Sequence, residues 1–282
     1  DTQIFLSFLY LSTTKNTEAM IENVVIIGAG NLATQLALAL TEKGIQVKQV
    51  FSRKLESASA LAEKVNAAFT NDLSQLLPEA DLYIVAVKDS AIQEVLENLH
   101  IKNDQLIVHT AGSVPMSILD GFSNNYGVFY PLQTFSKNRK IDFSTIPICI
   151  EASHPSTFLA LEKLAGRLSS SVNQINSDER KNLHLSAVFV NNFVNHLYAI
   201  GADILHEKRL DFGLLKPLIL ETAQKVQELH PSAAQTGPAK RYDQSIIAAQ
   251  LKMLHDKPEY QKIYSFVTES IFQFQQKHDH VL

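Results

Sequence analysis

The chain has 282 residues, of which 45% are hydrophobic and 19% charged, and this composition is typical of a globular protein with room for two domains. Its net charge of −4 argues against a nucleic-acid partner, because such a partner requires a basic surface. The single cysteine excludes a disulfide within the chain and indicates the reducing cytoplasm. From residue 20 onwards, no apolar run of the sequence is long enough to predict a membrane span.

Residues 1–19 form a leader that we expect to lie outside the fold. Residues 4–11 are apolar, but no basic segment precedes them and they are too few to cross a bilayer. Met20 follows, and the first predicted strand begins almost at once, so Met20 is the expected natural start. The alternative is a weak signal peptide.

Between residues 20 and 176, short β-branched runs alternate with helical stretches, which is typical of a doubly wound α/β domain with a parallel sheet. The predicted strands are 24–28, 46–51, 82–87, 106–109, 127–130, 146–150 and 172–175. The predicted helices are 32–43, 55–66, 90–99 and 155–168. Gly44 is placed to end the first helix, and Ser90 with Gln93 predicts a capping box. The sequence therefore predicts a Rossmann-type domain over residues 20–176.

From residue 177 to residue 282 the pattern is helical and contains no convincing strand. The predicted helices are 178–207, 212–229, 243–255 and 258–276. Asn176 and Glu179 have the spacing of a capping box for the first of them. That helix would be about 45 Å long, which suits the spine of a helical domain or a dimer interface. We expect this all-α domain to bind substrate and to form a homodimer.

The most informative motif lies in residues 24–33, which read VVIIGAGNLA. A β-branched run stops at Gly28, and Gly30 and Ala33 complete the G-x-G-x-x-A spacing of a dinucleotide-binding turn. Gly28 allows the tight turn, Gly30 lets the backbone approach a pyrophosphate, and Ala33 lets the helix pack closely on the strand. The phosphates are expected at the helix N-terminus, at Gly28, Gly30, Asn31, Leu32 and Ala33.

The end of the second predicted strand favours NADP over NAD. An NAD-binding domain carries an acidic residue there, but this chain reads Ser52-Arg53-Lys54. A hydroxyl and two cations suit a 2′-phosphate, and a guanidinium can also stack on adenine. A solvated basic turn is the alternative. The next strand ends in Val87-Lys88-Asp89, which we expect to face the cofactor because ligands bind at the carboxyl ends of parallel strands.

The strand that follows ends in His109-Thr110-Ala111-Gly112-Ser113. A histidine that closes a buried strand is more often structural than catalytic. We therefore expect Thr110 and Gly112 to line the substrate side of the active site, and we give His109 a structural role.

The long helix 178–207 carries the candidate catalytic residues. His184, Asn191 and Asn195 are separated by seven and four residues, which places them on one face of an α-helix among apolar neighbours. Asn192 is adjacent to that face. Polar groups in an apolar stripe must be hydrogen-bonded or functional, so a buried polar network is the alternative to catalysis. A histidine ordinarily titrates near neutrality, which makes His184 the expected proton donor, with Asn191 or Asn192 orienting the substrate or the nicotinamide amide.

A polar loop joins two of the predicted helices and reads QTGPAKRYD from Gln235. We expect Thr236, Gly237 and Arg241 to contact the substrate, since a guanidinium can hold a carboxylate or phosphate. Asp243 is expected to cap the following helix. No metal-binding cluster is predicted.

Together these segments resemble a Rossmann-like family of NADP oxidoreductases. The helical C-terminal domain of this family is similar to that of 6-phosphogluconate dehydrogenase and pyrroline-5-carboxylate reductase. The resemblance covers residues 22–276, and it is carried by IIGAGNLA, VAVKDSAI, HTAGSV, FYPLQTF, HLSAVFVNNF and QTGPAKRYD. Related dehydrogenases carry a catalytic lysine on the first long helix of the second domain, whereas His184 lies nearest here. Tyr130 and Tyr242 also depart from the usual pattern.

The resemblance and the motifs imply an NADP-dependent oxidoreductase that moves hydride to or from a small polar, anionic substrate with a C=O or C=N group. The resemblance also implies a dimer formed through the helical domain. The alternative is an NADP-binding sensor without turnover, which the missing lysine favours. A His184–Asn191 face directed at the cofactor would indicate an enzyme, and one sealed inside the helical domain would indicate a sensor.

Overall fold

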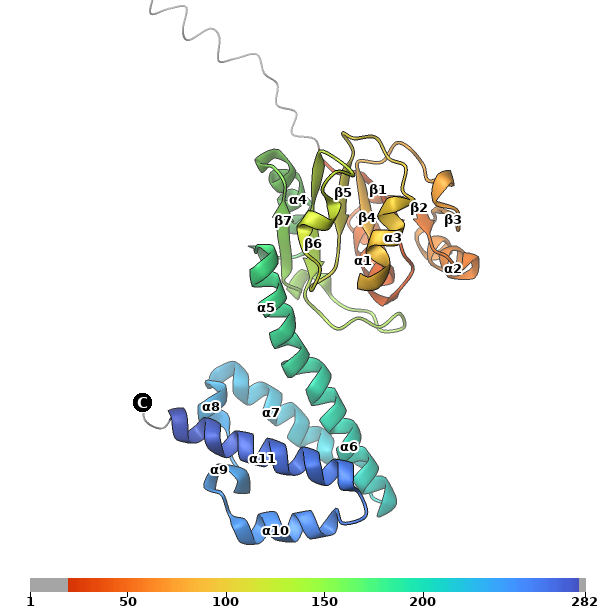
Figure 1. The fold of residues 1–282 in the computed structure, drawn as a ribbon. Helices are drawn as coiled ribbons and strands as arrows, with labels where there is room; N and C mark the ends of the chain where they lie inside the picture. Colours follow the sequence, from red (N-terminus) through yellow and green to blue (C-terminus); the bar gives the residue numbers. More distant parts are fainter. Residues whose placement is uncertain (1–19, 279–282) are drawn as a thin grey trace, which may run out of the picture. The chain divides into compact units, whose positions relative to one another are not determined.

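The computed structural model describes residues 20–278, so the predicted leader of residues 1–19 lies outside the described residues. The described chain forms two compact units, which divide between Asn191 and Asn192 (Figure 1). The first unit contains the sheet and the second is helical.

The first unit is built on one eight-stranded sheet with the order β3-β2-β1-β4-β5-β6-β7-β8. Its strands are β1 (Asn23–Ile27), β2 (Gln46–Phe51), β3 (Ala68–Thr70), β4 (Leu82–Val85), β5 (Leu106–His109), β6 (Asn125–Pro131), β7 (Ile148–Ala152) and β8 (Val172–Gln174). The chain moves outward from β1 to β3 and then returns to place β4 on the other side of β1. Such a reversal opens a crevice at the carboxyl ends of the strands.

Both faces of the sheet are covered, which explains the continuous apolar run of β1. Val24 and Ile26 pack into one core with α1 (Asn31–Glu42), α2 (Leu55–Val65) and α4 (Pro155–Leu168). Val25 and Ile27 pack into a second core with α3 (Ile92–Glu97). Alternate residues of a strand point to opposite faces, so a strand covered on both sides must be apolar throughout.

The predicted α/β fold is confirmed, with three local corrections. The sheet is parallel from β3 to β6. β7, however, runs antiparallel to β6, and β8 runs parallel to β7. β3 was missed because its three residues are too few to show a period. The predicted Ser90–Gln93 capping box is wrong, because α3 begins after Ala91 and no side chain caps it. The predicted end of the first helix is confirmed, with Gly44 at a positive φ of 76°.

The predicted helix 178–207 consists of three segments in the structure. These are α5 (Ser177–Ala187), a π-helical turn (Val188–Phe193) and α6 (Val194–Glu207). Its capping box is confirmed: the Asn176 side chain accepts the N–H groups of Asp178 and Glu179, and the Asn176 N–H donates to the Glu179 carboxylate at 2.9 Å.

The remaining helices are α7 (Lys216–Glu228), α8 (Pro231–Ala234), α9 (Pro238–Arg241), α10 (Gln244–Met253) and α11 (Pro258–His278). The short α8 and α9 were not predicted. Between residues 192 and 277 no apolar side chain is buried, and Leu214, Leu218 and Phe266 are each more than half exposed. None of the described helices combines the length and the apolar composition that a membrane span requires. Within one chain, residues 192–277 therefore form no buried apolar core.

The start of α5 belongs to the sheet unit because Arg180 anchors it there. This side chain is fully buried and forms an ion pair with Glu151 of β7. It also donates to the carbonyl oxygen of Val114 at 2.6 Å. Ser177 donates to Glu151 at 2.8 Å. These contacts explain why the compact units divide at Asn191, although the sequence-based boundary was placed where α5 begins, after residue 176.

The Arg180–Glu151 pair should contribute strongly to the stability of the sheet unit. Replacing Glu151 by Gln leaves a buried guanidinium without its counter-charge, and we expect a loss of about 3 kcal/mol in the free energy of unfolding. Glu22→Gln removes the partner of the more exposed Arg167, and its expected cost is below about 1 kcal/mol. Urea denaturation followed by circular dichroism measures both. Equal losses for the two variants would contradict the anchoring role.

Candidate functional site

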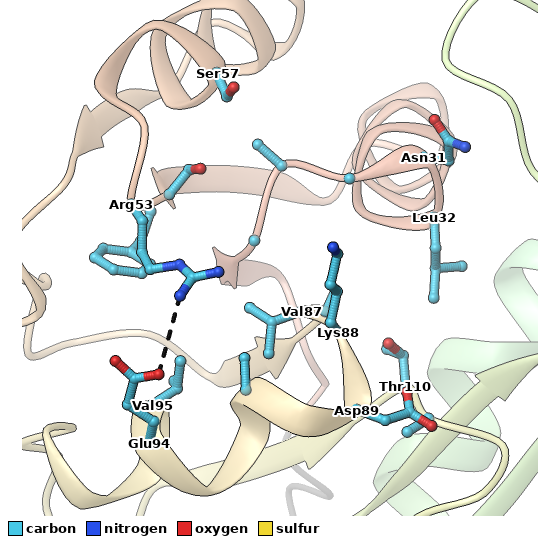
Figure 2. Close-up of a pocket in the computed structure, with 18 of the residues that line it drawn as sticks. Asn31, Leu32, Arg53, Ser57, Val87, Lys88, Asp89, Glu94, Val95 and Thr110 are labelled. Atoms are coloured by element: carbon cyan, nitrogen blue, oxygen red, sulfur yellow. Dashed lines mark ion pairs between the residues drawn. The ribbon is translucent and has the colours of Figure 1, made fainter.

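A cleft of about 1280 Å³ lies at the carboxyl ends of the central strands, in the sheet unit (Figure 2). Loops that follow β1, β2, β4 and β5 form most of its wall, and His184 of α5 also lines it. The cleft brings together most of the residues that were predicted from the sequence. These are Gly28, Gly30, Asn31, Leu32, Ser52, Arg53, Lys54, Val87, Lys88, Asp89, Thr110, Gly112 and His184.

The glycine turn after β1 has the geometry that was expected of it. Gly28 has a φ of 127°, and a Cβ atom there would lie 2.2 Å from the carbonyl oxygen of Ala86. A Cβ atom on Gly30 would meet nothing within 4 Å, so the space in front of this backbone is open. Ala33 does not line the cleft but is fully buried between α1 and the sheet.

The N-terminus of α1 is suited to an anion. Gly30 is its N-cap residue and supplies no side-chain hydrogen bond, and the first turn carries no acidic residue. The first N–H groups of a helix lack intrahelical acceptors, and the helix dipole adds positive potential at this end. A pyrophosphate placed over Gly30 would accept hydrogen bonds from these N–H groups and would lie in the positive potential of the helix dipole.

One end of the cleft is cationic and exposed. Ser52, Arg53 and Lys54 follow β2, and the Arg53 guanidinium lies 3.9 Å from the Glu94 carboxylate (Figure 2). Both side chains are about two-thirds exposed, so this ion pair contributes little to stability and is easily exchanged for another anion. The expected 2′-phosphate position is thus accessible in the structure.

Another part of the wall pairs His184 with Tyr130 of β6. The Tyr130 hydroxyl lies 3.1 Å from Nδ1 of His184, and the two rings meet edge to face at 6.2 Å. A Cβ atom on Gly112 would lie 2.5 Å from the same nitrogen, so only glycine leaves room for the imidazole. Burial raises the pKa of Tyr130 to about 12, which keeps its hydroxyl protonated at neutral pH. Tyr130 was noted in the sequence as an unusual residue but was not predicted as part of the site.

His109 is a buried histidine with a structural environment. It is fully inaccessible, and its Nδ1 accepts the N–H of Ala111 at 3.2 Å. Burial and, to a smaller extent, the nearby Arg180 guanidinium lower the pKa of His109 to about 4. The side chain is therefore neutral at physiological pH, and its buried Nε2 has no hydrogen-bond partner among the described residues.

Asn191 and Asn192 lie on the π-helical turn and are exposed; Asn191, the last residue of the sheet unit, does not line this cleft, and Asn192 belongs to the helical unit. The prediction of a shared face assumed a regular α-helix. A π-helical turn contains more residues, so a spacing of seven no longer returns to the face of His184. A catalytic role for the two asparagines stays a prediction.

The other predicted substrate residues belong to the helical unit. Thr236 is exposed, and Gly237 precedes α9 with a φ of 101°. Arg241 is exposed at the end of α9. Asp243 caps α10 as expected, and its carboxylate accepts the N–H of Ile246 at 3.3 Å. Contact of Thr236, Gly237 and Arg241 with a substrate stays a prediction.

Two family models match the chain, and the second match begins within the sheet unit. Residues 23–112 match the model of a family described as "NADP oxidoreductase coenzyme F420-dependent". Residues 146–271 match a "Domain of unknown function (DUF2520)".

Known proteins and structures show similarity over different lengths. A crystal structure from Bacteroides fragilis, described as a "putative NADP oxidoreductase", is 49% identical, with a TM-score of 0.85 over 90% of this chain and 98% of that one. Pyrroline-5-carboxylate reductase of Aquifex aeolicus is 33% identical over 76 residues, which cover 27% of this chain and only 29% of the reductase. An imine reductase of Myxococcus stipitatus in complex with NADP+ shares the fold at 15% identity, with a TM-score of 0.58 over 92% of this chain and 94% of that one.

Replacing Gly30 by Ala should separate nucleotide binding from folding. The backbone at Gly30 has a negative φ of −78°, and the added methyl meets open space, so the free energy of unfolding should be nearly unchanged. The same methyl would hold a pyrophosphate away, and we expect the Kd for NADPH to rise at least tenfold, about 1.4 kcal/mol.

The matched control is Gly166→Ala, since Gly166 lies in α4, outside the cleft, and also faces open space. Calorimetric titration measures both variants. An unchanged NADPH affinity in Gly30→Ala would show that the pyrophosphate does not approach this turn.

Proposed function

Because the chain belongs to the same family of NADP oxidoreductases as the Bacteroides fragilis protein, we propose that it reduces a C=O or C=N group of a small polar, anionic substrate with NADPH. The observation that carries this proposal is the composition of a single cleft. It joins an open glycine turn and exposed cations with the imidazole of His184. Such a cleft has the groups needed to hold a phosphorylated dinucleotide and to deliver a proton.

The preference for NADPH follows from the residues after β2. Ser52, Arg53 and Lys54 offer a hydroxyl and two cations where an NAD-binding domain offers a carboxylate. The NADP+ complex of the imine reductase, which shares this fold, is consistent with that preference. The match of residues 23–112 to the family described as "NADP oxidoreductase coenzyme F420-dependent" supports NADP binding by the same segment.

NADPH supplies the hydride when it is bound. The chain's own residues bind and orient the cofactor and the substrate, and they protonate the substrate. His184 is the proposed proton donor, because its ring lines the cleft beside Gly112 and Tyr130. Thr236 and Arg241 are the proposed contacts for an anionic substrate, on the basis of their residue types. The position of His184 in the cleft favours turnover over the alternative of a sensor that only binds NADP.

Binding of NADPH and NADH to the wild type and to Arg53→Ala tests the cofactor. We expect the wild type to bind NADPH at least tenfold more tightly than NADH, and Arg53→Ala to lose that preference. Lys64→Ala is the control, because it removes the same charge from α2 outside the cleft. Absence of binding of either nucleotide to the wild type would contradict the proposed function.

Turnover is then followed as NADPH oxidation with a panel of 2-keto acids and cyclic imines. Reduction of at least one anionic member is the expected result. Tight NADPH binding with no turnover across the panel would instead favour the sensor.

We also propose that the partner of the helical unit is a second copy of this chain. Residues 192–277 bury no apolar side chain, although they include large exposed side chains such as Leu214, Leu218 and Phe266. Exposed apolar side chains of this size often mark an interface between proteins, and a homodimer would bury them. The cytoplasm remains the predicted compartment.

Sedimentation equilibrium should therefore give twice the chain mass of 31.4 kDa. A species with the mass of one chain, 31.4 kDa, at micromolar concentration would contradict the homodimer.

A further inference from the structure

We infer that Tyr130 is a positioning residue, which donates its hydroxyl to Nδ1 of His184 and thereby holds the imidazole proton on Nε2. The sheet unit alone carries the geometry of this pair. Its catalytic consequence rests on the proposed reductase function, whereas the position of the proton does not.

The direction of the hydrogen bond follows from the partners of the Tyr130 hydroxyl. The oxygen lies 3.1 Å from Nδ1 of His184, and no other hydrogen-bond partner of Tyr130 is found among residues 20–278. If Nδ1 carried the proton and donated it, the phenol proton would have no acceptor among residues 20–278. The high pKa of Tyr130, about 12, excludes phenolate as the resting form. The phenol is therefore the donor and Nδ1 the acceptor.

Both rings are held in place by rigid elements. Tyr130 is 8% exposed and packs with Val128 and Cys149 in the third apolar cluster of the sheet. His184 lies one helical turn after Arg180, the residue that fixes α5 to β7. Gly112 lies against the imidazole, and a Cβ atom on this residue would lie 2.8 Å from Cγ of His184. These contacts restrict the positions of both rings and so maintain the hydrogen bond between them.

A proton on Nε2 determines what the cleft can bind. With Nδ1 occupied as an acceptor, neutral His184 offers an N–H donor and has no lone pair left on Nε2. It can donate a hydrogen bond to the oxygen or nitrogen of a C=O or C=N group. The resting tautomer therefore presents a hydrogen-bond donor to the group that is to be reduced.

The proton transfer balances through the pair. As negative charge develops on a carbonyl oxygen, Nε2 of His184 releases its proton to that oxygen, and Nδ1 takes the hydroxyl proton of Tyr130. One N–H and one O–H bond break, and one O–H and one N–H bond form. The transfer is favourable because an alkoxide is a much stronger base than a phenolate. Nδ1 then returns its proton to the phenolate, and Nε2 takes a proton from water, which restores the resting tautomer.

Nitrogen-15 NMR of labelled protein without cofactor tests the tautomer directly. Two-bond proton–nitrogen correlations distinguish a proton on Nε2 from one on Nδ1, and His184→Gln identifies the resonance among the ten histidines. We expect the wild type at high pH to carry the proton on Nε2. In Tyr130→Phe the ratio of the two tautomers should move toward Nδ1–H by about tenfold, since one hydrogen bond is lost.

Tyr126→Phe is the matched control, because it removes a hydroxyl from the same strand at a residue that does not line the cleft. It should leave the tautomer unchanged. A wild-type proton on Nδ1, or an unchanged ratio in Tyr130→Phe, would overturn the inference.

The catalytic arm is measured separately. Tyr130→Phe should lower kcat about tenfold or more while the Kd for NADPH stays the same. An unchanged kcat would refute the role of Tyr130 in proton supply. A wild type with the expected tautomer but no NADPH binding would contradict the proposed function and leave the position of the proton established.

Discussion

The buried ion pair between Arg180 and Glu151 is the contact on which the reacting side of the cleft depends. Removal of two charges from water is costly, and the hydrogen bonds from Ser177 to Glu151 and from Arg180 to the Val114 carbonyl offset part of that cost, although the buried Nε of Arg180 has no partner among the described residues. Those partners come from β7, from the start of α5 and from the loop after β5. One side chain thus fixes three segments, and His184 follows one helical turn later.

The sheet provides the rest of the site by presenting several loops at one edge. Its central strands are covered on both faces, so their ends are fixed within the unit. The loops after β1, β2, β4 and β5 then meet around one cleft, because parallel strands end at the same edge. At Gly28 and Gly112, two positions in the wall of this cleft, neighbouring atoms lie too close for a Cβ atom to fit.

Local patterns allowed much of this to be predicted. β2, β5 and α4 have the predicted bounds, and the glycine turn was found from spacing alone. The contacts that were missed join residues far apart in the chain, such as Tyr130 with His184 and Glu151 with Arg180. No periodicity reveals such pairs. The antiparallel direction of β7 was missed because a short buried strand reads the same in either direction. The π-helical turn has no sequence signature here, so the asparagines were placed by the wrong repeat.

The cleft combines a loosely held guanidinium, that of Arg53, with a tightly held imidazole, that of His184. Phosphate binding and proton transfer place different demands on these two side chains. A 2′-phosphate is attracted by charge, which acts over several ångströms and tolerates a mobile guanidinium such as Arg53. A proton donor must lie within hydrogen-bond reach of one atom, so its side chain has to be fixed in advance. Arg53 is accordingly exposed and held only by Glu94, whereas His184 is enclosed by Tyr130 and Gly112. The binding end can therefore remain open to solvent while the reacting end is preorganised.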